Sequence, residues 1–432
     1  MLLILEQVAA SVSGGIVGPF LWAPLAQRVG RCSLILSGTL LTLCFNIWSA
    51  TMTNESQYIA FIMSRWLAGI FSTAALTLGA GMILELFYLH QRGKAFAAYA
   101  ISSMFGVILA PVLSGFIIEY SSWTLQFWWC VAGLGVALIL TFLFLEDTTF
   151  TREDESTRLP EMSYLSNRVA TFFPGNKILQ TREKDSYLTV WMIFISPIAL
   201  MVGTALCLIF SWQVGLNIVV TIFLQTPVEE GGYGFTGGQN SEFLFCQWVA
   251  LALAEVYGFV LNDRSALWMC RRRGGVWKPE YRLFPVMILP CIAAPVGLIL
   301  FGVGIQYHLH YMVLATGFFL SSWADLALVP VLTTYLAEVF RGYASETYTA
   351  LWAWRLSLGV VIPFFLNGWL ARHGPAWCFG TMAIIAAAGT GILFTLVAKG
   401  HTLRRLLHTR YMQDEEGEKV VANEKDISIE TI

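Results

Sequence analysis

Charged side chains are scarce in this sequence. Asp, Glu, Lys and Arg make up 12% of its 432 residues, whereas soluble proteins average ~25%. So few charges cannot cover the surface of a soluble protein of this length, which excludes a cytosolic enzyme, a disordered scaffold and a collagen-like or coiled-coil rod. The net charge of −2 provides no electrostatic attraction for nucleic acid.

Motifs for metal or nucleotide chemistry are also missing. The eight Cys are scattered, without a C-x-x-C pair, so they are predicted to be small buried hydrophobic residues. The run 232–237 fits G-x-G-x-x-G, but no strand precedes it, which favours a flexible loop. His308 and His310 lack a third ligand for a metal ion. Neither an enzyme activity nor a cofactor is therefore expected.

Long apolar runs are what the sequence has instead. Hydrophobic residues make up 56% of the chain, and the ~30 Å core of a bilayer requires ~20 apolar residues in a helix. All spans are expected to be helices, because backbone polar groups in lipid must be satisfied within the segment. The predicted fold is therefore an all-α, polytopic membrane protein. Its eleven predicted spans are approximately 3–24, 32–50, 59–87, 95–118, 125–145, 197–224, 243–262, 284–305, 311–337, 347–371 and 376–398.

The basic residues predict the orientation. Of the 26 Lys and Arg residues, 23 fall in loops and ends on one side, which the positive-inside rule assigns to the cytoplasm. The first five spans are expected to form an N-terminal bundle, 1–145, and the last six a C-terminal bundle, 197–398. A cytoplasmic linker, 146–196, and a cytoplasmic tail, 399–432, complete the organisation. The sequon at Asn54 then lies outside, where it is open to glycosylation.

The first cytoplasmic loop carries a tight turn with basic residues at Gly18, Arg28, Gly30 and Arg31. This pattern resembles the signature loop between the second and third helices of the major facilitator superfamily, although Gln27 stands where the family usually has an acidic residue. The resemblance implies that the first span corresponds to the family's second helix, so the family's first helix is expected to be missing. The alternative is an ordinary cytoplasmic anchor between two spans.

Two later spans carry patterns of the same family. Arg65 lies well inside the third span, where an unpaired charge is costly, and it resembles the Arg motif of the family's fourth helix. Gly106, Pro111 and Gly115 in the fourth span resemble the antiporter motif of proton-driven exporters. The alternatives are that Arg65 snorkels to the outer headgroups and that the small residues form a general helix-packing face.

Acidic residues at the cytoplasmic ends of two spans extend the resemblance. Glu85 and Glu146 are placed where they can pair with Arg28 and Arg31. In the family, such pairs keep the cytoplasmic side closed while the outer side is open. Because Gln27 has no charge, this latch is expected either to be weakened or to rely on Glu85 and Glu146.

The most diagnostic segment is 263–283, in which clustered arginines precede Glu280 and Arg282. It resembles the loop between the eighth and ninth helices of fungal drug–proton antiporter-type facilitators, including the polyamine and secondary-metabolite branches. Glu338 and Arg355 fall within patterns that resemble the tenth and eleventh helices of the same branch.

Ionisable residues inside the membrane are the candidates for transport and proton coupling. Glu255 and Asp325 lie near the middle of their spans, and Arg355 on the following span is a candidate partner for Asp325. Carboxylates in a low-dielectric interior favour the neutral form and can exchange protons. Asp325 is the first candidate for the proton-linked acid. Glu255 is the second, and its alternative role is to pair with another helix.

The resemblance implies a secondary active transporter, with proton-coupled export of a small amphipathic organic compound such as a fungal secondary metabolite, toxin or drug. The expected partners are this substrate, protons and the lipid bilayer, and the protein is expected to be a monomer. The plasma membrane is the expected location, with the vacuolar membrane as the alternative. Transport of a polyamine-like cation and a non-transporting remnant remain alternative functions.

Overall fold

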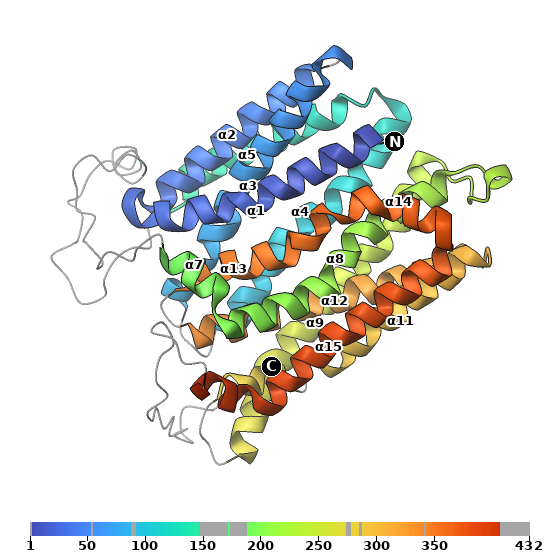
Figure 1. Cartoon of the computed structure of the whole chain (residues 1–432). Helices are drawn as coiled ribbons and strands as arrows, with labels where there is room; N and C mark the ends of the chain where they lie inside the picture. The colour runs from blue at the N-terminus through green and yellow to red at the C-terminus, as the bar shows by residue number, and fades with distance from the viewer. Residues whose placement is uncertain are drawn as a thin grey trace, which may run out of the picture.

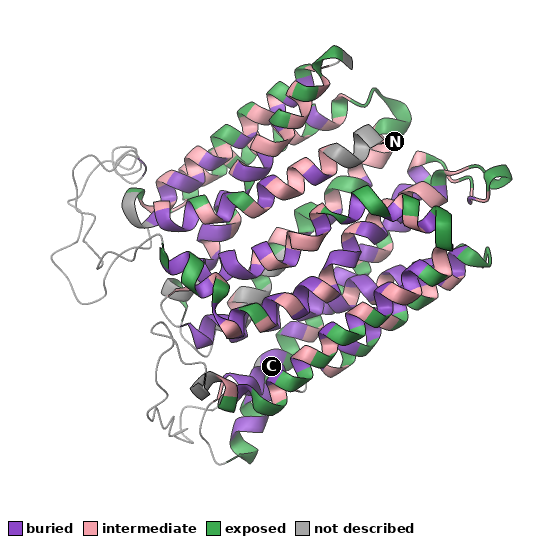
Figure 2. Ribbon diagram, viewed as in Figure 1, coloured by how far each residue is buried: buried purple, intermediate pink, exposed green. Residues whose placement is uncertain are grey.

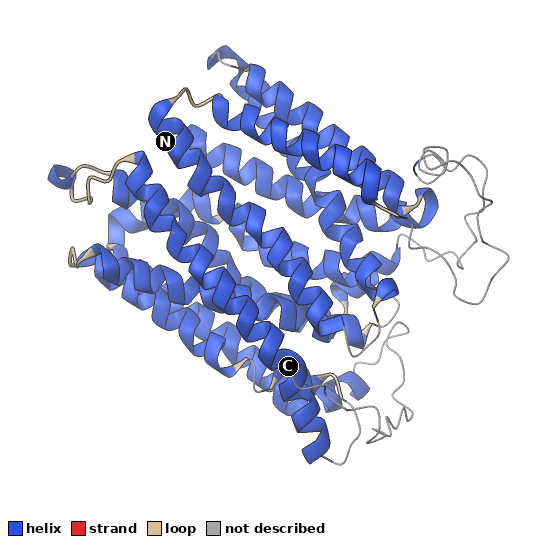
Figure 3. Ribbon diagram, turned by 180° about the vertical axis from the view of Figure 1, so that it is seen from behind, coloured by secondary structure: helices blue, strands red, loops and turns tan. Residues whose placement is uncertain are grey.

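The computed structural model describes residues 2–52, 55–87, 92–146, 172, 188–273, 278–284, 287–340 and 343–406. Within these ranges every regular element is a helix, as the view from behind shows (Figure 3). The described part of the chain contains ten helices that are long and apolar enough to cross a membrane, or up to eleven spans if one bent pair counts as a single span. The all-α polytopic fold that the apolar runs predict is confirmed.

The first five long helices form one bundle (Figure 1). The break between the first two falls at Gly30, whose φ of 93° lies in the left-handed region, where a side chain would be strained. A short 3-10 turn, η1 (Glu55–Gln57), precedes the third helix. The helices are α1 (Leu2–Val29), α2 (Arg31–Thr51), α3 (Tyr58–Leu86), α4 (Arg92–Tyr120) and α5 (Leu125–Phe144).

Helices α1 and α3 cross with their backbones nearly touching. A Cβ at Gly14 would collide with the carbonyl oxygen of Trp66, and a Cβ at Gly69 would collide with that of Ser11. In a membrane, where packing replaces the hydrophobic effect, such small residues allow the close approach that holds helices together. The glycines therefore fix α1 against α3.

The remaining helices form a second bundle (Figure 1). Two of them are short, and two 3-10 turns join longer ones. The elements are α7 (Leu188–Ile195), α8 (Pro197–Gln225), η3 (Val228–Glu230), α9 (Gly237–Arg272), α10 (Glu280–Leu283), α11 (Ile288–Gln306), α12 (Tyr311–Val339), α13 (Ala344–Ser357), η4 (Leu358–Val360), α14 (Ile362–His373) and α15 (Pro375–Leu406).

Helix α7 lies within the segment 146–196, which the sequence analysis assigns to the cytoplasmic linker. Its residues are entirely apolar apart from one threonine, and it packs against α8 and α13. Ser196 then caps α8, because its hydroxyl accepts a hydrogen bond from the N–H of Ala199 at 3.4 Å. The packed part of the second bundle therefore begins before residue 197.

The tenth predicted span, 347–371, is bent rather than continuous. Helices α13 and α14 meet at an angle of 41°, with η4 between them. Pro363 occupies the first turn of α14. Proline has no N–H to donate to the preceding turn, and its ring crowds the carbonyl there, so the helix bends at this point.

The two bundles meet along several helices, mainly α4 and α1 of the first bundle. Helix α4 lies along α9, and α1 lies beside α13 and α14 (Figure 1). Burial is heaviest in α12, whereas α5 has a single buried residue, Phe127. The colouring by burial shows the same contrast between the two bundles (Figure 2). The packed interior therefore runs through the second bundle to its contact with the first, and this is where Glu255, Asp325 and Arg355 lie.

Candidate functional site

A small closed cavity lies between the two bundles, and Glu255 of α9 and Arg355 of α13 line it. The first bundle contributes one wall through Tyr99, Ser103 and Met104 of α4. The free volume is about 20 Å³, which holds a water molecule but no organic compound. As the structure shows it, this cavity is therefore closed to an organic substrate.

Asp325 of α12 lies next to this cavity, beside Arg355. Its side chain is 2% exposed, and Arg355 interacts with it electrostatically. Within the described ranges, neither carboxylate oxygen has a hydrogen-bond partner. On the same helix, the Ser322 hydroxyl accepts a hydrogen bond of 2.7 Å from the side-chain amide of Gln213. A buried carboxylate without hydrogen bonds is costly as an anion, so it gains from taking up a proton.

Arg355 is held by rings rather than by an ion pair. Its guanidinium carbon lies 3.6 Å from the centre of the Phe210 ring of α8 and 5.2 Å from that of Trp352. One nitrogen, Nη2, contacts the sulfur of Met104 at 3.7 Å. The other two nitrogens, Nε and Nη1, find no acceptor in the described part of the chain. Cation–π contacts with Phe210 and Trp352 hold this buried charge in place without satisfying its hydrogen-bond donors.

Glu255 is the second buried carboxylate at the cavity. It is 7% exposed, and no ion pair involves it among the described residues. The alternative reading, in which Glu255 pairs with a charge on another helix, therefore has no support in these ranges. Glu255 and Arg355 thus line the same cavity, and Asp325 interacts with Arg355 without a close ion pair, an arrangement that the positions of these residues in the sequence allowed but did not require.

Arg65 lies apart from these three residues. Its guanidinium carbon is 5.5 Å from the centre of the Phe127 ring of α5, and neighbouring Ser64 shares a hydrogen bond of 2.8 Å with Ser49 of α2. Arg65 does not line the cavity between the bundles. Its role in proton coupling stays a prediction.

The signature-like loop is partly described. A Cβ at Gly18 would collide with the carbonyl oxygen of Ile70, so this glycine is required for the α1–α3 crossing. The guanidinium of Arg31 borders Gly81 of α3, and so does the hydroxyl of Ser345 at the start of α13. Arg31 therefore lies where the two bundles meet, at the end that the basic loops assign to the cytoplasm.

The predicted partners of these arginines are only partly described. The side chains of Arg28 and Glu85, and the whole of Asn54, lie outside the described residues. Glu146 is exposed, and its backbone carbonyl accepts a hydrogen bond of 3.3 Å from the Cys32 thiol. The predicted latch of Glu85 and Glu146 with Arg28 and Arg31 remains untested.

Only one residue of the antiporter-like pattern reaches the contact between the bundles. A Cβ at Gly115 would collide with the hydroxyl of Ser241 on α9. Gly106 and Pro111 are exposed, and a Cβ at Gly106 would meet open space. Gly115 therefore allows the close α4–α9 approach, whereas Gly106 and Pro111 remain exposed.

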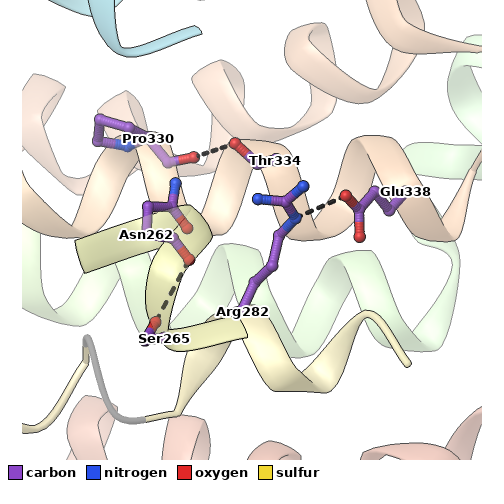
Figure 4. A network of polar contacts seen from close by, with 6 residues as sticks. All are labelled: Asn262, Ser265, Arg282, Pro330, Thr334 and Glu338. Atoms are coloured by element: carbon purple, nitrogen blue, oxygen red, sulfur yellow. Dashed lines mark hydrogen bonds and ion pairs between the residues drawn. The ribbon is translucent and has the colours of Figure 1, made fainter. Parts of the chain in front are cut away.

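A paired charge cluster lies at the opposite end of the second bundle from the outer loops. Arg282 of α10 extends toward Glu338 at the end of α12, and its Nε lies 2.5 Å from the nearer carboxylate oxygen (Figure 4). Both side chains are 3% exposed. Ser265 and Thr334 nearby are satisfied by backbone carbonyls, of Asn262 and Pro330 respectively. The family-like segment 263–283 is thus tied to α12 by a buried ion pair.

Sequence reasoning missed the residues that complete the cavity from the first bundle. Met104 and Tyr99 are single apolar or aromatic residues in an apolar helix, and nothing in their spacing marks them. Tyr348 and Trp352 of α13, whose rings stack with centres 6.0 Å apart, lie four residues apart on one helix face. Arg355 follows Trp352 by three residues, so all three side chains share this face. Their spacing was the only feature of the sequence that could have indicated these cavity residues.

The two histidines of the outer loop, His308 and His310, contact neighbouring groups of the protein. The Nδ1 atom of His310 accepts a hydrogen bond of 3.3 Å from the N–H of Met312, and the His308 ring lies 5.9 Å from that of Tyr233. No group of three potential metal ligands occurs among the described residues.

Known proteins of similar sequence are membrane transporters. The sequence profile of the Major Facilitator Superfamily matches residues 7–317. The efflux pump radE of Floropilus chiversii is 28% identical over 418 residues, covering 94% of this chain and 74% of that protein. The efflux pump vrtL of Penicillium aethiopicum is 25% identical over 402 residues, covering 90% and 76%. The MFS-type transporter hepF of Aspergillus oryzae is 27% identical over 411 residues, covering 92% and 80%.

Solved structures show the same fold. The xylose transporter XylE from E. coli, in a partially occluded inward-open conformation, matches with a TM-score of 0.62 at 16% identity, covering 91% of this chain and 87% of that one. The human organic anion transporter MFSD10 matches with a TM-score of 0.59 at 17% identity, covering 90% and 83%. With a profile match over most of its length and this two-bundle fold, the chain belongs to the Major Facilitator Superfamily, as a multi-pass membrane transporter and not an enzyme.

Proposed function

We propose that the protein exports a small amphipathic organic compound, such as a fungal secondary metabolite, toxin or drug, in exchange for protons. The observation that carries the proposal is a group of three buried ionisable residues at the cavity between the bundles. Glu255 and Arg355 line this cavity, and Asp325 interacts with Arg355. None of the three makes a close ion pair within the described ranges. Buried ionisable groups of this kind are costly, and in membrane proteins they mark proton and substrate pathways. That radE and vrtL are named efflux pumps supports the direction.

In this proposal, Asp325 and Glu255 carry the protons. Each carboxylate is more stable protonated while the cavity is closed and dry, and each can release its proton when one side opens to water. Rocking of one bundle against the other along the α4–α9 and α1–α13 contacts would expose these residues to each side in turn. Proton release on the inner side and uptake on the outer side would then drive the substrate outward. We place the protein in the plasma membrane.

The test begins by finding the compound. The chain is expressed in a fungal host, and metabolites in cells and medium are compared by mass spectrometry with those of a host carrying an empty vector. A compound that shifts from cells to medium is then offered to inside-out membrane vesicles with an acidic lumen. The proposal predicts accumulation in the vesicles that a protonophore abolishes. Accumulation that persists at equal pH on both sides, without a membrane potential, would contradict it.

A further inference from the structure

We propose that Arg355 recognises the substrate by donating hydrogen bonds to an oxygen atom on it. When the protein is closed and empty, the sulfur of Met104 takes the position of that oxygen beside Arg355. The inference rests on the proposed function, because it takes the cavity between the bundles as the transport site. It adds the chemical class of the substrate: a flat apolar compound that carries a carboxylate, phenolate or carbonyl oxygen.

The first step is that the contact between Met104 and Arg355 crosses from one bundle to the other. Met104 belongs to α4 of the first bundle, and Arg355 belongs to α13 of the second. The Nη2 atom of Arg355 lies 3.7 Å from the Met104 sulfur. A thioether is a weak acceptor, so it fills this position without binding Arg355 strongly.

The second step is that Arg355 stays in place when Met104 leaves. Phe210, against which its guanidinium stacks, and Trp352 both belong to the second bundle, on α8 and α13. Opening of the cavity separates α4 from these helices, because a free volume of about 20 Å³ admits no organic compound until they part. Opening therefore removes the one acceptor that Arg355 has among the described residues.

The third step is what replaces the sulfur. A buried guanidinium with free Nε, Nη1 and Nη2 is costly, and an oxygen acceptor that binds it relieves this cost more fully than a thioether does. The opened site is therefore more stable with a substrate oxygen bound at Arg355 than without one. Trp352 adds another donor, since its indole N–H has no acceptor in the part of the chain that the structure describes.

The aromatic side chains beside Arg355 define the rest of the substrate. Tyr348 stacks on Trp352, and the Tyr99 ring from the opposite bundle meets Tyr348 edge-on at 6.3 Å. Aromatic rings favour flat partners, which they contact by stacking or edge-to-face. When α4 moves away, the space beside Tyr348 that the Tyr99 ring filled becomes available to a flat apolar body whose oxygen lies at Arg355.

The experiment measures binding to the purified full chain in lipid nanodiscs, with no pH gradient, by calorimetry. The probe is 2-naphthoate, a flat apolar body with two acceptor oxygens, and the matched control ligand is 2-naphthylmethylammonium, which has a cation and no acceptor. We expect saturable binding of 2-naphthoate that is tighter than that of the ammonium compound. No saturable binding of 2-naphthoate, or tighter binding of the ammonium compound, would overturn the inference.

Two variants at one position test the role of Met104. Met104→Leu keeps the volume and removes the sulfur, so it should tighten 2-naphthoate binding. Met104→Gln supplies a stronger acceptor to Arg355, so it should weaken 2-naphthoate binding. Each change in affinity should be about threefold, as expected for one ordinary hydrogen bond. Thermal unfolding of both variants confirms that they are folded. Shifts in the same direction, or no shift in either, would overturn the inference. If the binding results hold but pH-driven flux is absent, recognition by Arg355 stands and the proton-coupled function fails.

Discussion

Two arginines of the second bundle illustrate two ways in which the protein holds a buried charge. Arg282 is matched by Glu338 at 2.5 Å, with both side chains enclosed. Arg355 is also enclosed, but it has rings and a thioether for neighbours, and Asp325 interacts with it only at longer range. Matched charges make a fixed structural joint, whereas unmatched charges can change partners. The first pair is therefore expected to govern stability and the second to govern transport.

Removal of one member of the matched pair tests the structural role. Glu338→Leu removes the carboxylate that Arg282 Nε contacts at 2.5 Å, and loss of one member of a buried pair should lower the free energy of unfolding by about 3–5 kcal/mol. The double variant Arg282→Met with Glu338→Leu removes both charges of the pair and should regain most of that loss. Thermal unfolding in detergent compares the three proteins. A single variant as stable as the wild type would show that the pair is not a structural joint.

Arg65 gives a prediction of a different kind, because it lies against Phe127 and away from the cavity. Its match to a family pattern predicts a part in proton coupling, in which the planar guanidinium matters as well as the charge. Arg65→Lys keeps the charge but loses the five-donor fork. Transport driven by a pH gradient should fall several-fold per molecule at the surface, while surface abundance stays the same. Equal transport by the two proteins would assign Arg65 a structural role.

At the scale of helices, close crossings are set by glycine. A Cβ at Gly317 of α12 would lie 2.7 Å from the backbone nitrogen of Phe301 on α11, and a Cβ at Gly297 would lie 2.7 Å from the carbonyl oxygen of Gly317. Each glycine thus occupies the space that a side chain on the other would need. Helices α11 and α12 cross through these two positions.

This crossing predicts a contrast between two similar substitutions. Gly317→Ala forces α11 and α12 apart and should lower the unfolding temperature by several degrees. Gly380→Ala in α15 is the matched control, because a Cβ there meets nothing within 4 Å and alanine favours a helix. It should leave the unfolding temperature unchanged or slightly raised. Equal effects of the two substitutions would contradict the role of the crossing.

The sequence predicted the spans well because each is a long apolar run bounded by charged or turn residues. Prolines alone did not predict bends. Pro111 and Pro330 lie inside continuous helices, whereas Pro363 marks a 41° break, because neighbouring packing decides whether a freed carbonyl is tolerated. The helix α7 was missed for a similar reason. Its run of eight residues is too short to span a membrane, and only packing against α13 reveals its place.

The site was predictable as single residues but not as an arrangement. Asp325, Glu255 and Arg355 are conspicuous as charges within apolar runs. In the helices that carry them, apolar and polar residues are not separated onto distinct faces, so periodicity does not show which side points inward. The same limitation hid Met104, which is ordinary in composition and important only because the opposite bundle brings Arg355 to it. Arg65 is as conspicuous as the others, yet it lies elsewhere.

At the scale of the whole molecule, the basic loops predict which end faces the cytoplasm. Epitope tags inserted within 146–171 and after residue 425 should both be inaccessible to antibody in intact cells and accessible after permeabilisation. The reason is the concentration of 23 of the 26 Lys and Arg residues on one side. A tag in an outer loop such as 227–236 is the control and should label intact cells. Labelling of either cytoplasmic tag without permeabilisation would overturn the orientation.

The most direct test of the whole account compares wild-type protein with Asp325→Asn in inside-out vesicles. Asparagine is nearly the same shape as aspartate, but it cannot exchange a proton. The measurement records, per molecule of protein, both the exchange of substrate between equal pools and its accumulation against a gradient driven by an acidic lumen. Proton coupling through Asp325 predicts that exchange survives while gradient-driven accumulation is lost. Accumulation equal to that of the wild type would contradict the account.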